Sequence, residues 1–125
     1  MAEGDMTNPE PAEQPGQLSV VSTTMEGIRV LMLTGEIDHH TGNQFQRALY
    51  FSDAPRPRIV VDLGGVTFMD STGINILISA HRALSEAGGW LRLTAPGETV
   101  KRTMNIVGID TIIDCRETLH QALSS

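Results

Sequence analysis

Residues 58–84 constrain the fold more than any other stretch of the sequence. They begin with a β-branched run at residues 59–61, which is typical of a strand buried on both faces of a sheet. Gly64-Gly65 is expected to break this strand. An apolar helical pattern then begins at residues 70–73 and continues as far as Ala87. A buried strand that leads into a helix is the repeating unit of α/β proteins.

The rest of the chain repeats this alternation after an opening hairpin. A short turn at residues 25–27 joins the first two strand patterns, so these strands are expected to be antiparallel. Strand and helix then alternate, which predicts right-handed crossovers between parallel strands. We therefore predict one α/β domain, a mostly parallel mixed sheet of about five strands with four helices. The predicted strands span residues 18–24, 28–34, 59–63, 90–94 and 111–115, and the predicted helices span residues 41–49, 71–87, 96–107 and 117–123.

The first 17 residues differ in composition from the rest of the chain. They contain three prolines, four acidic residues and no Lys or Arg. Such a segment buries too little apolar surface to offset the entropy lost on ordering. We therefore predict a disordered acidic tail at residues 1–17 and a folded domain at residues 18–125.

The helical patterns also predict which side chains face inward. After Ser71, the polar positions form one narrow stripe, and the remaining apolar arc is wider than one helix–sheet contact needs. Either neighbouring helices cover the surplus or part of the arc binds a partner. In the helix at residues 96–107, Val100, Met104 and Val107 are expected to face the core. Thr41 is expected to cap the first helix.

Composition and charge exclude several classes of function. The formal net charge is −6 and no long basic run occurs, which argues against nucleic acid or an anionic membrane as the main partner. No apolar run is long enough to span a bilayer, and the N-terminus lacks the pattern of a signal peptide. Cys115 is the single cysteine, so no internal disulfide can form and a structural thiol is predicted. These features together predict a cytoplasmic protein.

The chain lacks the motifs of common enzyme and cofactor sites. It contains no phosphate loop, no dinucleotide-binding glycine motif and no nucleophile elbow. The adjacent His39 and His40 would point in opposite directions on an extended chain, which makes them a poor metal chelate. We therefore predict no catalysis, no cofactor and no metal site.

Two acidic side chains occupy positions where α/β proteins place their sites. Asp38 and Asp70 both lie in segments that leave a strand and approach a helix, and Ser71 follows Asp70. Such segments gather at the carboxyl ends of parallel strands. The three residues are therefore expected to share one edge of the molecule. Each aspartate can be a structural cap only, or the group can form a functional site.

Two segments around these residues resemble a known family. TGEIDHHT at residues 34–41 and VTFMDSTG at residues 66–73 closely resemble the two signature segments of bacterial anti-sigma factor antagonists. These anti-anti-sigma factors are STAS domains, and the sporulation anti-anti-sigma factor is among them. The resemblance extends from Leu18 to about Leu123. The chain departs from the family in its acidic tail and in Thr72, where many members have serine.

The resemblance implies a function without enzymatic activity. Ser71 would be the phosphoacceptor of a partner kinase that is also the anti-sigma factor. The unphosphorylated antagonist would bind this kinase and free the sigma factor, and a metal-dependent serine phosphatase would reverse the modification. A monomer or a weak dimer is expected. The residues expected to form the partner-binding surface around Ser71 are Glu36, Asp38, His39, His40, Thr41, Asp70, Thr72, Gly73 and Ile74.

Two other hypotheses remain open on the sequence. A STAS scaffold without a switch would serve a signalling assembly or a transporter-associated complex. A small enzyme or nucleotide-binding protein would use the same edge of the sheet, although the missing phosphate loop and the missing nucleophile–base pair weigh against it.

Overall fold

The structure is a computed structural model that describes residues 17–51 and 55–124. The predicted tail, residues 1–17, lies outside the described residues except for Gln17. The helices and strands follow the predicted order, with one additional 3₁₀ turn, η2. They are β1 (Leu18–Met25), β2 (Ile28–Ile37), α1 (Gly42–Ala48), β3 (Arg58–Met69), α2 (Ser71–Glu86), β4 (Trp90–Thr94), α3 (Glu98–Val107), η2 (Ile109–Thr111), β5 (Asp114–Arg116) and α4 (Leu119–Leu123).

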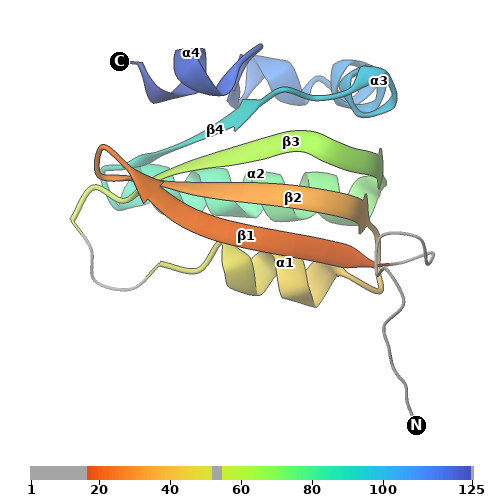
Figure 1. Cartoon of the computed structure of the whole chain (residues 1–125), viewed down its shortest axis with the longest axis horizontal. Coiled ribbons are helices and arrows are strands. Elements are labelled where there is room, and N and C mark those ends of the chain that lie inside the picture. The colour runs from red at the N-terminus through yellow and green to blue at the C-terminus, as the bar shows by residue number, and fades with distance from the viewer. Residues whose placement is uncertain (1–16, 52–54, 125) are drawn as a thin grey trace, which may run out of the picture.

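The five strands form one mixed sheet in the order β1-β2-β3-β4-β5 (Figure 1). β1 and β2 are antiparallel, whereas all other neighbouring strands are parallel. The hairpin turn has positive φ at both Glu26 and Gly27, which suits the twist of a tight hairpin. The predicted α/β class, the opening hairpin and the mostly parallel sheet are confirmed.

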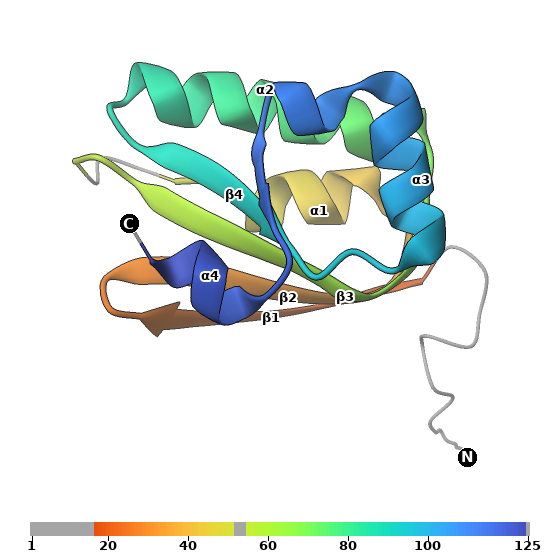
Figure 2. The ribbon, with the colours of Figure 1, turned by 90° about the horizontal axis from the view of Figure 1, so that it is seen from above.

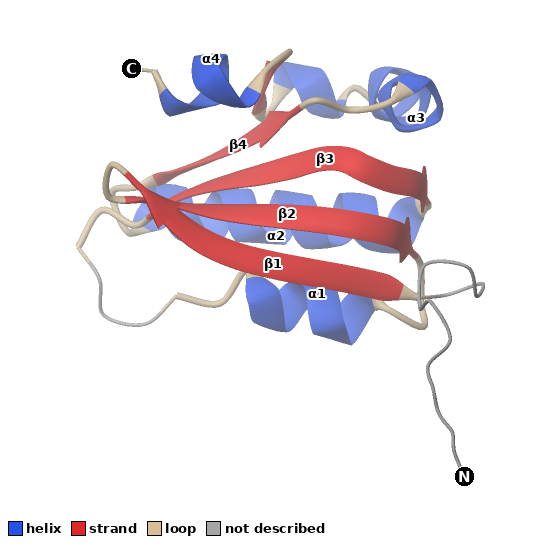
Figure 3. Ribbon diagram, viewed as in Figure 1, coloured by secondary structure: helices blue, strands red, loops and turns tan. Residues whose placement is uncertain are grey.

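Helices cover the two faces of the sheet unequally (Figures 2 and 3). α1 and α2 lie on one face, and α4 lies on the other face near the hairpin turn. Side chains between the sheet and α1 and α2 form the main core, which is aliphatic apart from Phe45. α3 adds Val100 and Met104 to this core. The α4 face has a smaller core around Val30, Val60 and Ala122.

β3 is longer than predicted, so the expected break at Gly64-Gly65 is wrong. The strand continues through both glycines to Met69. A Cβ atom at Gly65 would lie 2.7 Å from the carbonyl oxygen of Leu33 on β2, a separation that only glycine permits. The register between β2 and β3 shifts at two places along this stretch. The glycines therefore allow a bulged, close approach of two strands. β2 correspondingly runs to Ile37 and not to the predicted end at residue 34.

The C-terminal third also differs in detail from the prediction. Residues 109–111 form the 3₁₀ turn η2, so β5 begins at Asp114, later than predicted. α4 begins at Leu119 because Thr118 caps it through a reciprocal hydrogen-bond pair with Gln121. Val107 was expected to face the core, but it is 52% exposed. The helix ends there, and the chain turns at Gly108 with φ 75°, so Ile109 fills the core position.

Candidate functional site

The carboxyl ends of β2 and β3 bring the two signature segments together. Ile37 pairs with Met69 at the last position of the parallel ladder. The backbone N–H of Asp70 donates to the carbonyl of Ile37, with an N···O distance of 3.2 Å. Asp38 and Asp70 therefore leave neighbouring strands at the same edge of the sheet. The structure brings these residues together as the sequence predicts.

The start of α2 presents Ser71 to solvent. Asp70 is the N-cap, and its Oδ1 accepts a hydrogen bond of 2.9 Å from the backbone N–H of Thr72. Ser71 is the first residue of the helix and is exposed, whereas Thr72 is half-buried and Gly73 is buried. No hydrogen bond of the Ser71 hydroxyl is found among the described residues. Because Asp70 does the capping, the hydroxyl of Ser71 remains accessible.

Gly73 and Ile74 hold this helix start against the sheet. A Cβ atom at Gly73 would lie 2.8 Å from Ile37 Cγ2 and 2.7 Å from Met69 Cγ. The side chain of Ile74 is buried in the main core. The first turn of α2 therefore packs tightly on the ends of β2 and β3, and the position of Ser71 is well fixed.

Hydrogen bonds also fix the loop that carries Asp38. Asp38 Oδ1 accepts from the backbone N–H groups of His40 at 2.9 Å and Thr41 at 3.2 Å. Thr41 Oγ1 donates to the carbonyl of Glu36 at 2.9 Å and accepts from the N–H of Asp38 at 3.0 Å. Thr41 occupies the N-cap position of α1 but its side chain caps no helical N–H, so the predicted capping is wrong. Its buried hydroxyl instead closes the loop on itself.

The remaining predicted residues are His39 and His40 in this loop and Glu36 near the end of β2. His39 and His40 are exposed and lie in a turn, where their ring centroids are 4.0 Å apart. The expectation that the two side chains point in opposite directions is therefore wrong. Glu36 is half-buried and pairs in the β ladder with Phe68, which is 42% exposed. Phe68 is not among the residues that the sequence predicts for the site. Its position two residues before Asp70 in the second signature segment is the signal that was available.

The candidate site is acidic. Glu36, Asp38 and Asp70 contribute carboxylates, and none of the predicted site residues is Lys or Arg. Within residues 17–51 and 55–124, no three His, Cys, Asp or Glu side chains come together as a metal centre requires. Burial raises the pKa of the Cys115 thiol to about 11, so this thiol is protonated and unreactive at neutral pH.

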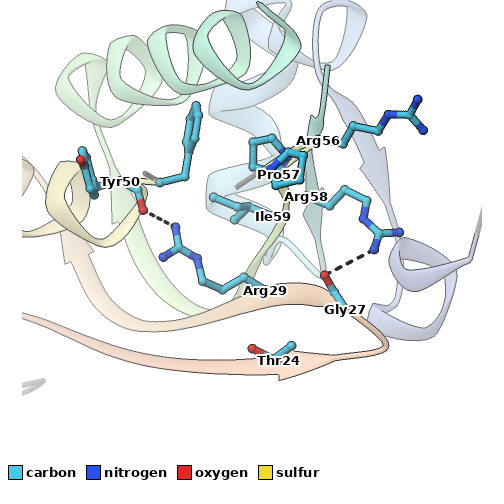
Figure 4. Close-up of a pocket in the computed structure, with 10 residues that line it drawn as sticks. Thr24, Gly27, Arg29, Tyr50, Arg56, Pro57, Arg58 and Ile59 are labelled. Carbon is cyan, nitrogen blue, oxygen red and sulfur yellow. Dashed lines mark hydrogen bonds between the residues drawn. The ribbon is translucent and has the colours of Figure 1, made fainter. Parts of the chain in front are cut away.

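A cavity of about 420 Å³ opens at the opposite end of the sheet, where β2 and β3 begin (Figure 4). Arg29, Arg56 and Arg58 line it, but the guanidinium groups of Arg29 and Arg58 point in different directions. Each donates to a backbone carbonyl, Arg29 to Tyr50 at 2.7 Å and Arg58 to Gly27 at 3.4 Å. Burial lowers the pKa of Arg29. These side chains do not converge on one point, so the cavity is not a second candidate for the site.

The sequence of this chain matches the profile of the STAS domain over residues 19–122. The chain belongs to the STAS-domain family. It is 29% identical over 111 residues to the anti-sigma-F factor antagonist RsfB of Mycobacterium tuberculosis, an alignment that covers 88% of this chain and 90% of RsfB. The resemblance to STAS-domain anti-sigma factor antagonists is thereby confirmed. The anti-sigma factor antagonists of this family are regulators without enzymatic activity.

Solved structures agree with this assignment. An anti-sigma factor antagonist from Mycobacterium paratuberculosis superposes with a TM-score of 0.79 at 28% identity, covering 88% of this chain and 94% of that chain. SpoIIAA in its unphosphorylated form superposes with a TM-score of 0.67 at 23% identity, covering 84% and 93% of the two chains, which shows a shared fold. None of the helices described here is long and apolar enough to cross a membrane.

Proposed function

We propose that this STAS domain is an anti-sigma factor antagonist that is switched by phosphorylation of Ser71. In its unphosphorylated form it binds an anti-sigma factor that is also a serine kinase, and this binding releases the sigma factor. Phosphorylation of Ser71 by the kinase dissociates the complex. A serine phosphatase removes the phosphate, so that the complex can form again. The observation that carries the proposal is the exposed Ser71 hydroxyl, next to the Asp70 cap and at the same sheet edge as Asp38. These exchanges would take place in the cytoplasm, on a protein that is a monomer or a weak dimer and binds neither nucleic acid nor membrane.

The position of Ser71 allows phosphorylation without loss of the fold. A phosphoserine carries a charge of about −1.5 to −2 at neutral pH. The first turn of a helix has unpaired N–H groups and the positive end of the helix dipole, which stabilise an anion there by about 0.3–1 kcal/mol. The Ser71 side chain is exposed, so the phosphate would remain hydrated.

The same charge would oppose a partner docked on this edge. Asp38 and Asp70 already make the surface acidic, and no Lys or Arg of the predicted site can neutralise a further anion. A partner that covers Ser71 would have to bury a dianion without a counter-charge, which is costly. Phosphorylation would therefore weaken the complex while leaving the domain folded.

The deciding experiment incubates the full chain with its cognate kinase and ATP and maps the phosphate by mass spectrometry. We expect phosphate on Ser71, none in Ser71→Ala, and normal incorporation in the control Thr72→Ala. Ser71→Ala should bind the kinase constitutively, because it adds no charge. Ser71→Asp should bind less tightly than wild type but more tightly than the phosphorylated protein, since it adds only about one negative charge. Phosphate on Thr72 in the wild-type protein would overturn the assignment.

A second variant tests the role of the neighbouring loop. Asp38→Ala should fold, because Asp38 lies outside the core, yet it should be phosphorylated slowly or bind the kinase weakly. If Asp38→Ala retained the wild-type rate and affinity, Asp38 would be only a turn residue. If no residue of the wild-type chain were modified, a STAS scaffold without a switch would replace the proposal.

A further inference from the structure

The start of α1 packs against the start of α2. Gly42, the first residue of α1, is buried and faces Thr72. A Cβ atom on Gly42 would lie 2.9 Å from the Thr72 methyl carbon Cγ2 and 3.4 Å from Ile76 Cδ1. Real Cβ atoms essentially never come as close as 2.9 Å to another heavy atom, so Thr72 occupies the space that a side chain at position 42 would need.

We propose that the Gly42–Thr72 contact is a positioning contact that makes Ser71 the sole phosphoacceptor of the Ser71-Thr72 pair. This inference rests on the proposed phosphorylation switch. Two adjacent hydroxyl side chains begin α2, and a kinase that docks on this edge meets both. The contact selects between them by holding Thr72 against α1 while Ser71 faces solvent.

The surroundings of Thr72 support this selection. Thr72 is half-buried, whereas Ser71 is exposed. A threonine side chain in a helix has few allowed χ1 rotamers, so packing its methyl group against Gly42 also fixes the direction of its hydroxyl. The backbone N–H of Thr72 is held by Asp70 Oδ1 at 2.9 Å, which limits movement of the residue as a whole.

The same contact joins the two signature segments. Gly42 follows Thr41, whose hydroxyl ties the ends of the loop that carries Asp38. Thr72 follows Ser71 in the first turn of α2. The approach of Gly42 to Thr72 therefore contributes to the spacing between the Asp38 loop and the Ser71 hydroxyl, together with the packing of Gly73 on Ile37 and Met69. A bulkier residue at position 42 would push the two segments apart or rotate Thr72.

The test is Gly42→Ala in the full chain, with Gly97→Ala as the matched control. Gly97 is also at a helix start, but a Cβ atom there would have no neighbour within 4 Å. With the cognate kinase and ATP, we expect Gly42→Ala to lower kcat/KM for Ser71 about tenfold, because the acceptor is displaced. We also expect phosphate to appear on Thr72. Gly97→Ala should retain the wild-type rate and acceptor.

A compensating variant separates positioning from general damage. Thr72→Ser removes only the methyl group that the new Cβ would meet. The double variant Gly42→Ala/Thr72→Ser should regain the wild-type rate at Ser71. The unfolding midpoints of wild type, Gly42→Ala, Thr72→Ser and the double variant should show the same rescue in the absence of kinase.

The outcomes distinguish this inference from the proposed switch. If wild type is phosphorylated on Ser71 and Gly42→Ala behaves identically, the switch stands and the role of Gly42 is overturned. Loss of rate in Gly42→Ala without rescue by Thr72→Ser would likewise overturn the contact. If wild type is not phosphorylated at all, the switch falls, and the role of Gly42 falls with it.

Discussion

The two faces of the sheet are closed in different ways. On the face covered by α1 and α2, the main core contains twenty buried apolar side chains among the described residues. On the α4 face, the corresponding cluster contains four. The Ser71 edge is built on the first face, where Gly73 and Ile74 pack into the ends of the strands. We expect the domain to tolerate an added charge at Ser71, because the buried side chains beneath this edge, and not its exposed surface, provide the stability.

Polar contacts compensate for the small core under α4. Arg92 Nη1 donates to the carbonyls of Ala122 at 2.9 Å and Ser124 at 2.7 Å, and Arg116 Nη1 donates to the carbonyl of Gln121 at 2.7 Å. Asp114 connects the two arginines. Its carboxylate accepts two hydrogen bonds of 2.8 Å from Arg116 and lies 3.4 Å from Arg92 Nε. The two arginines thus connect the last carbonyls of α4 to β4 and β5 through hydrogen bonds.

Truncating the main core should have the largest effect on stability. Leu77 of α2 is fully buried between the helix and the sheet. We expect Leu77→Ala to lower the free energy of unfolding by about 2–5 kcal/mol, through lost burial and the cavity left behind. Urea titration followed by circular dichroism measures this loss. A cost below about 1 kcal/mol would show that the face covered by α2 is not the main source of stability.

Truncating a side chain on the α4 face should lower the free energy of unfolding less than Leu77→Ala does, and the effect should stay in that region. Leu119 is half-buried and packs on the smaller core. Leu119→Ala should cost about 1–2 kcal/mol. Amide hydrogen exchange should accelerate in α4 while protection in β2 and β3 is retained. If exchange increased equally in the central strands, the two faces would unfold as one unit, which would contradict the proposed difference between the two faces of the sheet.

The interactions of Asp114 with Arg92 and Arg116 should make a small, pH-dependent contribution to the free energy of unfolding. The hydrogen bonds from Arg116 lower the pKa of Asp114 below its usual value, with the charges of both arginines adding to the effect. A lowered folded-state pKa gives stability that is present above the unfolded-state pKa, near 4, and is lost as the pH falls through the folded-state pKa. We expect Asp114→Asn to cost less than about 1 kcal/mol at neutral pH, because the side chain is 44% exposed.

The measurement for Asp114 is a comparison across pH and salt. The difference in stability between wild type and Asp114→Asn should shrink below pH 4 and at high salt. A difference that grew as the pH fell would show that the carboxylate does not anchor α4.

Deleting residues 1–16 should have the smallest effect. The segment has four acidic residues and few large apolar ones, so it adds little burial. We expect a change within about 0.5 kcal/mol in the free energy of unfolding, measured by thermal melts. Gln17 should be kept, because its carbonyl accepts a hydrogen bond of 2.9 Å from the N–H of Glu36. A clear loss of stability would mean that the tail packs on the domain.

The sequence predicted the parts of the molecule that depend on periodicity and on chain order. Alternation of strand and helix gave the class, and consecutive parallel strands explain why Asp38 and Asp70 meet at one edge. The polar stripe of Asn75, Ser79 and Arg82 is exposed as the spacing predicts. These features follow from neighbours in the sequence, so no knowledge of distant contacts is needed.

The errors come from contacts that residue type and periodicity alone do not reveal. Gly64-Gly65 predicts a break in the strand, because the approach of β2 to Gly65 is not visible in the local sequence. Val107 has the right spacing to face inward, but the turn at Gly108 gives its place in the core to Ile109. Thr41 has the residue type of a helix cap, yet the carbonyl of Glu36 competes for its hydroxyl. Propensity describes what a residue can do, and packing decides among the options.

The single cysteine of this chain makes it a convenient protein for site-directed labelling. Maleimides and related probes react with thiolates, and a thiol with a pKa near 11 has only about one part in ten thousand of thiolate at pH 7. Cys115 is also half-buried. A cysteine introduced at an exposed position such as Ser79 would therefore take up a fluorophore or spin label selectively, without replacing the native residue. Complex formation at the Ser71 edge can then be followed by spectroscopy on an otherwise unaltered domain.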